Sequence, residues 1–231
     1  MDLASLHDIQ RAFRLLEPQF YGRLDILVCN TGIICAPPSL SPEGYEIRWA
    51  TNYLGHALLI ELLLPLLTRT ASSYGDARVV NITSEGLMLA PADKSIVFDE
   101  LKTKQEYGFG ARWKRYGESK LSQVLYTSQI AQQNPTLSIT AIHPGVVGTD
   151  LVKMLGLADR RLVYATSTVI SPEDGCKNSL WGATAPTQSI ENGAYCSPIA
   201  EPGKQTRWTK DGDLAEKLWK RTEEAHQSYI A

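Results

Sequence analysis

Tyr116-Gly117-Glu118-Ser119-Lys120 lies in a stretch whose pattern predicts a helix that continues to about Gln132. On a helix, residues four apart share one face, one turn from each other. The phenol of Tyr116 and the ammonium group of Lys120 are therefore expected to project into the same small volume. A nearby cation favours the phenolate and lowers the pKa of a tyrosine from its ordinary value near ~10. Such a tyrosine can give or take a proton at a carbonyl or alcohol oxygen.

Three short apolar runs, rich in β-branched residues, predict buried parallel strands at residues 24–30, 78–84 and 137–142. A last short strand is expected at 193–196. Helices are expected between and around the strands, over residues 5–16, 45–67, 171 onward and 214–227. Pro18 should end the first of these helices. Because strand and helix alternate, the chain is predicted to be an α/β protein with a parallel sheet, right-handed crossovers and helices on both faces.

Each predicted strand runs into a polar turn that could carry chemistry. Asn30-Thr31-Gly32 follows the first strand, Ser84 ends the second, and His143-Pro144-Gly145 follows the third. Parallel sheets bind ligands at the carboxyl ends of their strands, so these turns are expected to meet at one edge. Between Thr149 and Ile170 the pattern is irregular and typical of a mobile flap over a pocket. Its apolar residues favour a small lipophilic carbonyl or alcohol as substrate; they are Leu151, Met154, Leu155, Leu157, Leu162 and Val163.

Composition restricts the class of protein. With 43% hydrophobic and 21% charged residues among 231, the chain can bury one good core, and we expect a single domain over 1–231. A formal net charge of -2 gives no electrostatic reason to expect binding to nucleic acid or to an anionic membrane. The longest apolar stretch, 54–67, is interrupted by glycine, histidine, glutamate and proline, so it predicts a buried helix rather than a membrane span.

Cysteine usage and the first residues indicate the compartment. The four cysteines show neither Cys-x-x-Cys nor Cys/His ligand spacing, which favours reduced structural thiols and no metal site. The sequence begins with no basic region followed by an apolar stretch, so no signal peptide is expected. We therefore predict a soluble, cytoplasmic protein.

Five motifs, in order and each on its predicted element, resemble the short-chain dehydrogenase/reductase family along nearly the entire chain. Asn30-Thr31-Gly32 is similar to the family's Asn-Ala-Gly turn, and Pro144-Gly145 with Thr149 is similar to its Pro-Gly-x-x-x-Thr segment. The remaining matches are the helix asparagine, the strand-end serine and the tyrosine–lysine pair of the family: Asn52, Ser84, Tyr116 and Lys120. The text around Phe98-Asp99-Glu100-Leu101 and 141–146 most resembles the retinol-dehydrogenase-like branch.

The resemblance implies a role for each matched residue in a hydride-transfer oxidoreductase. Tyr116 would be the general acid for carbonyl reduction or the base for alcohol oxidation, and Ser84 would hold the substrate oxygen. Lys120 would lower the pKa of Tyr116 and bind the nicotinamide ribose, while Asn52 would anchor a water that feeds the lysine. Pro144, Gly145 and Thr149 would embrace the nicotinamide, beside the turn of Asn30 and Gly32. The cofactor implied is NADP, from the branch, or NAD.

One part of the family pattern is absent from this sequence. Family members begin with a strand, a glycine-rich turn and a helix that hold the pyrophosphate, followed by a unit that selects NAD or NADP. The opening residues 2–6 instead resemble the text after the family's third strand, so about two βαβ units, on the order of 30 residues each, are expected to be missing. Asp2 stands where the family often contacts adenine. The implied fold is an N-terminally truncated Rossmann-like domain in which the 24–30 strand forms an uncovered apolar sheet edge.

Three functions remain open at this point. The chain could be an NAD(P)-dependent oxidoreductase, and resemblance to the family implies a homodimer paired through the helices of Asn52 and Tyr116. It could be a cofactor-free isomerase, dehydratase or cyclase in which Tyr116, Lys120 and Ser84 transfer protons alone. It could also be a catalytically silent binding protein.

Overall fold

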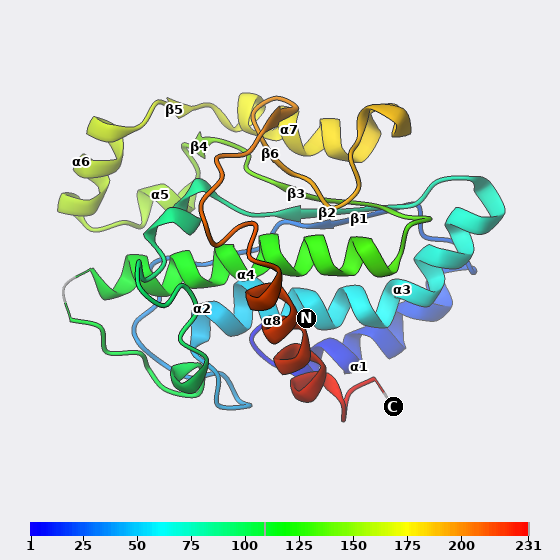
Figure 1. The fold of residues 1–231 in the computed structure, drawn as a ribbon, viewed down its shortest axis with the longest axis horizontal. Helices are drawn as coiled ribbons and strands as arrows, with labels where there is room; N and C mark the ends of the chain where they lie inside the picture. The colour runs from blue at the N-terminus through cyan, green and yellow to red at the C-terminus, as the bar shows by residue number, and fades with distance from the viewer. Residues whose placement is uncertain (109, 231) are drawn as a thin grey trace.

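A mostly parallel sheet with helices on both faces forms the centre of the molecule (Figure 1). The structure is a computed structural model that describes residues 1–108 and 110–230. The main sheet has the strand order β1-β2-β3-β6-β7, in which only β7 is antiparallel to its neighbour. The strands are β1 (Ile26–Cys29), β2 (Arg78–Ile82), β3 (Ser138–Ile142), β6 (Tyr195–Ser197) and β7 (Glu201–Pro202), with a separate parallel pair of β4 (Val146–Val147) and β5 (Val169–Ile170).

The helices include those that the sequence predicts, with two more between residues 149 and 170. They are α1 (Leu6–Leu16), α2 (Ile47–Trp49), α3 (Gly55–Tyr74), α4 (Ala111–Gln133), α5 (Asp150–Lys153), α6 (Leu157–Thr166), α7 (Pro172–Thr184) and α8 (Gly212–His226). Ser5 caps α1 and Ser171 caps α7, each by accepting a hydrogen bond from the backbone three residues on. The α/β class and the alternation of elements are therefore confirmed, with strands one to three residues shorter than predicted.

The predicted helix over 45–67 is divided. Between α2 and α3 the backbone forms a π-helix over Ala50–Leu54, all of whose residues are buried. Asn52 lies in the middle of this wider turn. Single π-turns inside α-helices occur often at functional sites, and hydrophobic periodicity does not reveal them, because the apolar pattern continues through the turn.

The prediction that 149–170 is irregular was wrong. This segment holds α5, α6 and β5. The reason is that α6 buries none of its residues, so it lacks the apolar stripe by which an amphipathic helix is recognised in a sequence.

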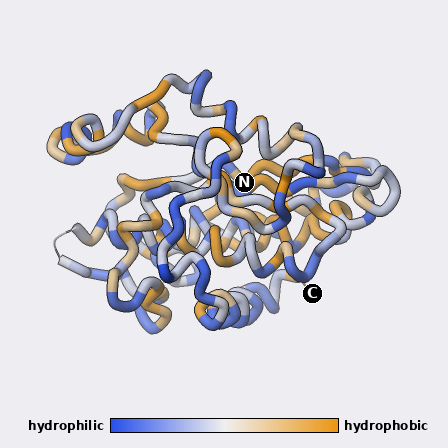
Figure 2. The backbone as a smooth tube through the Cα atoms, turned by 45° about the horizontal axis from the view of Figure 1, so that its top comes forward, coloured by the Kyte–Doolittle hydropathy of each residue, from blue (hydrophilic) through white to orange (hydrophobic). Residues whose placement is uncertain are grey.

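The two faces of the sheet are covered by different helices. Val79 and Ile139 belong to the core that α3 and α4 complete, whereas Ile142 packs on the opposite side against Gly182 of α7. Figure 2 shows apolar segments concentrated where the sheet meets these helices. The strands advance in one direction from β1 to β6, yet α7 covers the face opposite to α3 and α4. The crossover from β3 to β6 therefore has the opposite hand to the two before it, which corrects the expectation of uniformly right-handed crossovers.

Strand β1 forms one edge of the sheet, as predicted. It pairs with β2 on one side, and Ile26 and Val28 are 40% and 45% exposed. An exposed apolar edge strand can pair with a further strand.

Helix α8 packs across α3 and α4. Trp219 stacks on Tyr126 with ring centres 5.4 Å apart, and Thr222 bonds the Tyr53 hydroxyl. His226 places its ring nitrogens 2.9 Å from Glu61 Oε2 and 3.1 Å from the Leu54 carbonyl oxygen. Homodimerisation through α3 and α4 stays a prediction, and α8 covers part of the surface that it would use.

One helical run, Ile47–Tyr74, is long and apolar enough to cross a membrane by length and composition. Its most apolar window is 72% buried inside the fold. Leu54, Leu58, Ile60 and Leu67 are each no more than 1% exposed, so the run serves as the core helix of this domain.

Candidate active site

Tyr116 and Ser84 meet at the carboxyl end of the sheet. Tyr116 lies on α4 with 5% of its surface exposed, and Ser84 follows β2. Gly86 lies between them: a Cβ built on it would stand 2.6 Å from Tyr116 Cε1 and 3.2 Å from Ser84 Oγ. Burial raises the pKa of Tyr116 to about 12, against a smaller lowering by the Ser84 side chain. The phenol is therefore a protonated group beside a hydroxyl at neutral pH.

Gly117 lets helix α4, which carries Tyr116, lie close to the segment that follows Ser84. A Cβ at Gly117 would lie 2.2 Å from the backbone nitrogen of Ala90 and 2.6 Å from the Leu89 carbonyl carbon. Helix α4 thus presses directly on the backbone of the 3-10 helix over Glu85–Leu89, which begins at Ser84. The Thr83 hydroxyl donates a further hydrogen bond to the Lys120 carbonyl at 2.8 Å.

Substituting Gly117 with Ala is expected to destabilise the protein by about 1–3 kcal/mol, the usual cost of overpacking, because the contacting atoms are backbone and cannot rotate away. Urea unfolding measures this loss. Gly212→Ala is the matched control, since Gly212 is also helical and a Cβ added to it would meet no atom within 4 Å. Equal stabilities of the two variants would show that α4 does not rest on Ala90.

Lys120 lies one turn beyond Tyr116 and points into the protein. Its Nζ is 5.8 Å from the centre of the Tyr116 ring and donates to the Ile82 carbonyl at 2.9 Å and to Gln123 Oε1 at 2.8 Å. Burial lowers the pKa of Lys120 to about 7. The shared helix face is as predicted, but the pKa of Tyr116 is raised rather than lowered. The reason is that burial acts on both groups and the ammonium is directed at two protein oxygens.

Asn52 joins the turn after β1 to helix α4. Its Oδ1 accepts from the Ile33 backbone at 2.7 Å, and its Nδ2 donates to the Ile33 carbonyl at 3.0 Å and to Ser119 Oγ at 2.9 Å. Ser119 in turn donates to the Tyr116 carbonyl at 2.8 Å. The side-chain amide thus fixes the loop relative to Tyr116, and the water-anchoring role of Asn52 stays a prediction.

The backbone of Gly32 lies close to Lys120. A Cβ on Gly32 would stand 3.3 Å from Asn52 Oδ1 and 3.6 Å from Lys120 Nζ. His56 supports the same turn, with Nε2 2.8 Å from the Thr31 carbonyl oxygen, as expected of a packing histidine. A hydroxylated ring such as a nicotinamide ribose fits this arrangement, because it could approach the glycine backbone and the ammonium group together. Lys120, Gly32, Pro144 and Gly145 are the residues that would hold it.

The remaining residues that were predicted to bind the cofactor differ in how far they are exposed. Pro144 and Gly145 follow His143, whose pKa is lowered by burial; the charge of Glu85 opposes this lowering, and the charge of Lys120 adds to it least. Gly145 has a φ of +93° and is covered by Ile170, whose Cδ1 lies 2.8 Å from the position of a Cβ. The other three, Asn30, Thr149 and Asp2, are exposed, and the Asp2 carboxylate accepts from its own Ala4 backbone at 2.9 Å.

No strand, glycine-rich turn and helix of the pyrophosphate-binding kind occurs within residues 1–108 and 110–230. The residues described therefore contain no counterpart for the pyrophosphate of a dinucleotide.

Apolar side chains from the flap and from the loop after β1 share one buried cluster with Tyr116. Ile34, Val152 and Leu155 are its other buried members, and Val163 of α6 packs on this group. Part of the 149–170 segment thus packs in the same cluster as the candidate acid, and its role as a flap stays a prediction. Further apolar neighbours of the group are Cys35, Trp113, Val146 and Leu151.

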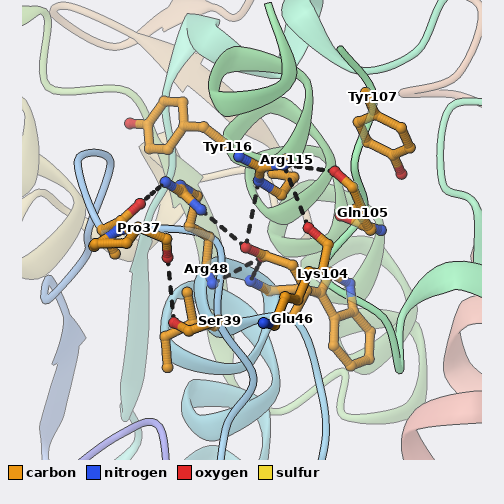
Figure 3. Close-up of polar contacts among 12 residues, drawn as sticks. Pro37, Ser39, Glu46, Arg48, Lys104, Gln105, Tyr107, Arg115 and Tyr116 are labelled. Carbon is orange, nitrogen blue, oxygen red and sulfur yellow. Dashed lines mark hydrogen bonds and ion pairs between the residues drawn. The ribbon is translucent and has the colours of Figure 1, made fainter.

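A buried charge cluster, which the sequence did not suggest, supports the same region (Figure 3). The Glu46 carboxylate lies between Arg48, at 2.9 Å, and Arg115, at 3.6 Å. Arg48 also donates to the carbonyls of Ile34 and Ala36, and Arg115 donates to that of Gln105 at 2.5 Å. The cluster therefore fixes the loop that supplies Ile34 and the segment before α4. Charged residues at 46 and 48, in an otherwise apolar helix, are the only sequence signal.

Comparison with known proteins places these features in a family. No protein-family model matches the chain. It is 33% identical to the short-chain dehydrogenase/reductase drtF of Aspergillus calidoustus, over 97% of this chain and 74% of that protein. It is 31% identical to human retinol dehydrogenase 14, over 95% of this chain and 63% of that protein. The chain thus spans about two thirds to three quarters of the length of these relatives.

The fold is similar to that of a solved dehydrogenase. The crystal structure of a 3-alpha-hydroxysteroid dehydrogenase from Pseudomonas sp. B-0831, complexed with NADH, superposes with a TM-score of 0.67 at 17% identity, covering 87% of this chain and 81% of that one. With its tyrosine–lysine helix, its strand-end serine and a relative one third identical to it, the chain belongs to the short-chain dehydrogenase/reductase family of oxidoreductases, close to its retinol dehydrogenases.

Proposed function

We propose that this chain interconverts a small lipophilic carbonyl compound and its alcohol, with NADP or NAD as the partner, and that Tyr116 is the proton donor in the reduction. The observation that carries the proposal is the buried, protonated phenol of Tyr116 beside Ser84, one helical turn from Lys120.

The chain's own residues would divide the work as follows. The Ser84 hydroxyl would bind the substrate oxygen, and the Tyr116 hydroxyl would give it a proton as negative charge develops there. Lys120 would hold ribose hydroxyls at the space beside Gly32, and its charge would favour the phenolate left by proton transfer. The nicotinamide supplies the hydride. A phenol pKa near 12 suits the reduction direction, because the donor stays protonated at neutral pH.

The proposed substrate class rests on the apolar side chains that pack in the same cluster as Tyr116. Ile34, Val152 and Leu155 replace water around the phenol, and an apolar ligand that displaces them loses little solvation. We further propose that the protein works in the cytoplasm, where its four free thiols would stay reduced.

Calorimetric titration with NADPH and NADH tests the cofactor part of the proposal. Saturable binding of at least one of them is expected. Lys120→Met should weaken it about ten- to a hundredfold, since one or two charged hydrogen bonds are lost. Reduced nicotinamide mononucleotide, which carries only the riboside end, is expected to bind the same site and to lose affinity in the same variant. Absence of binding by all three compounds would overturn the proposal.

A second function would use the same arrangement of Tyr116, Ser84 and Lys120. In it, Tyr116, Lys120 and Ser84 would transfer protons without a cofactor, as in an isomerase, dehydratase or cyclase. Cofactor-free turnover of ketones or enols by the wild type but not by Tyr116→Phe, together with no nicotinamide binding, would select this function.

A further inference from the structure

Gln123 is a buried side chain that accepts a hydrogen bond from the Lys120 ammonium group. Lys120 is 4% exposed, and Gln123 has no exposed surface. Gln123 Oε1 accepts from Lys120 Nζ at 2.8 Å, and the Ile82 carbonyl accepts a second bond at 2.9 Å. Within residues 1–108 and 110–230 no carboxylate forms an ion pair with Lys120. Neutral oxygens therefore replace the water that a buried ammonium has lost.

The orientation of the Gln123 amide is set by two further side chains. Its Nε2 donates to Asn81 Oδ1 at 2.9 Å, and Asn81 Nδ2 lies 3.2 Å from Thr127 Oγ1. Thr127 closes the ring by donating to the Gln123 carbonyl at 2.7 Å. Asn81 and Thr127 are each 1% exposed. An amide has one accepting and one donating end, so turning it around would place an NH₂ group against the ammonium and leave Asn81 without its donor.

We propose that Gln123 is a positioning residue for the proposed reaction: anchored by Asn81 and Thr127, it fixes where the Lys120 ammonium lies and stabilises its charged form. Its effect on catalysis would pass through Lys120, and that part of the inference rests on the proposed function.

The surroundings of Lys120 make this effect measurable. The other titratable groups that face it are Tyr116 on its own helix, His56 on α3 and His143 after β3. Burial lowers the pKa of His56 to about 4, so this imidazole stays neutral near pH 7. With the pKa of Lys120 lowered by burial to about 7, a change in one hydrogen-bond acceptor alters the charged fraction of the lysine at neutral pH.

Two substitutions of similar volume separate this role from simple packing. Gln123→Met fills the space without an oxygen, so it should disfavour the ammonium. Gln123→Glu places a carboxylate 2.8 Å from the same nitrogen, at the position of Oε1, so it should favour the ammonium. If Gln123 only packed the core, the two substitutions would not shift the pKa of Lys120 in opposite directions.

Nuclear magnetic resonance of the full chain with ¹³C-labelled lysine gives the readout without substrate or cofactor. The Lys120 signal is assigned by its loss in Lys120→Arg. We expect its titration midpoint to fall by about one pH unit in Gln123→Met and to rise by about one pH unit in Gln123→Glu, each a tenfold change in proton affinity. Unchanged midpoints, or shifts of the same sign in both variants, would overturn the inference. If Gln123→Met does not fold, the rise in Gln123→Glu decides alone.

Enzyme assays then connect the charge to catalysis. If charged Lys120 is needed, carbonyl reduction should decline as pH rises through the lysine midpoint, earlier in Gln123→Met and later in Gln123→Glu. Opposite midpoint shifts without turnover in any variant would uphold Gln123 as the partner of Lys120 and refute the oxidoreductase. Turnover with identical pH profiles in all three proteins would refute the positioning role and leave the oxidoreductase standing.

Discussion

Tyr116→Phe is expected to lower kcat for carbonyl reduction by about 10²- to 10⁴-fold, the usual contribution of a positioned acid. The variant removes only the hydroxyl, because the ring is buried among Gly86, Ile34 and the flap and should stay in place. Water cannot replace the lost donor, since the site is covered. The substrate KM should change little, because Ser84 remains to hold the substrate oxygen.

The measurement is steady-state reduction of apolar aldehydes and ketones with NADPH and NADH. Tyr74→Phe is the matched control: Tyr74 is 60% exposed at the far end of α3, and a phenylalanine there can keep the stacking of Arg23. The control should retain wild-type kcat. If Tyr116→Phe retains it as well, Tyr116 is not the proton donor.

Glu46→Gln is expected to destabilise the fold by about 3–5 kcal/mol, the usual effect of breaking a buried ion pair. The carboxylate is completely buried, and the side chains of its partners Arg48 and Arg115 are 1% and 4% exposed. Its Oε2 also accepts from the Arg48 and Trp49 backbones at 2.8 and 2.9 Å. A neutral amide keeps the shape but leaves two buried guanidinium groups without a counter-charge.

Urea unfolding of both proteins measures this difference. Glu216→Gln serves as control, because Glu216 pairs with Lys220 at 2.6 Å on the exposed face of α8, where solvent screens the charges. The control should unfold as the wild type does. A Glu46→Gln protein as stable as this control would contradict the pairing in Figure 3.

Much of the fold could be predicted because its signals are local. Ser5 and Ser171 mark helix starts through bonds to residues three positions on. The β2 and β3 runs are apolar throughout because both faces of these strands are covered. The π-turn at Asn52 and the hand of the β3–β6 crossover could not be predicted, since each depends on packing between distant segments rather than on the period of the local pattern. Helix α6 was missed because it buries none of its residues and so carries no apolar stripe.

The candidate site, too, could be predicted only in part. The spacing of Tyr116 and Lys120 placed both on one helix face, and the strand-end rule brought Ser84 to the same edge as Gly32. The shift in the pKa of Tyr116 was predicted with the wrong sign, because burial of the phenol raises the pKa by more than the Ser84 side chain lowers it. Gln123 could have been noticed as the residue one turn after Lys120, but its orientation depends on Asn81 from a neighbouring strand.

The sequence alone determined which groups can react and on which elements they lie, because residue type and periodicity are properties of short stretches. The tertiary structure alone decided how far the pKa values of those groups are shifted and which partners hold their side chains in place. Desolvation of Tyr116 and Lys120, the pairing of Glu46 with two arginines and the amide that faces the ammonium group all arise from atoms far apart along the chain. Their energies depend on distances and burial that only the folded chain creates.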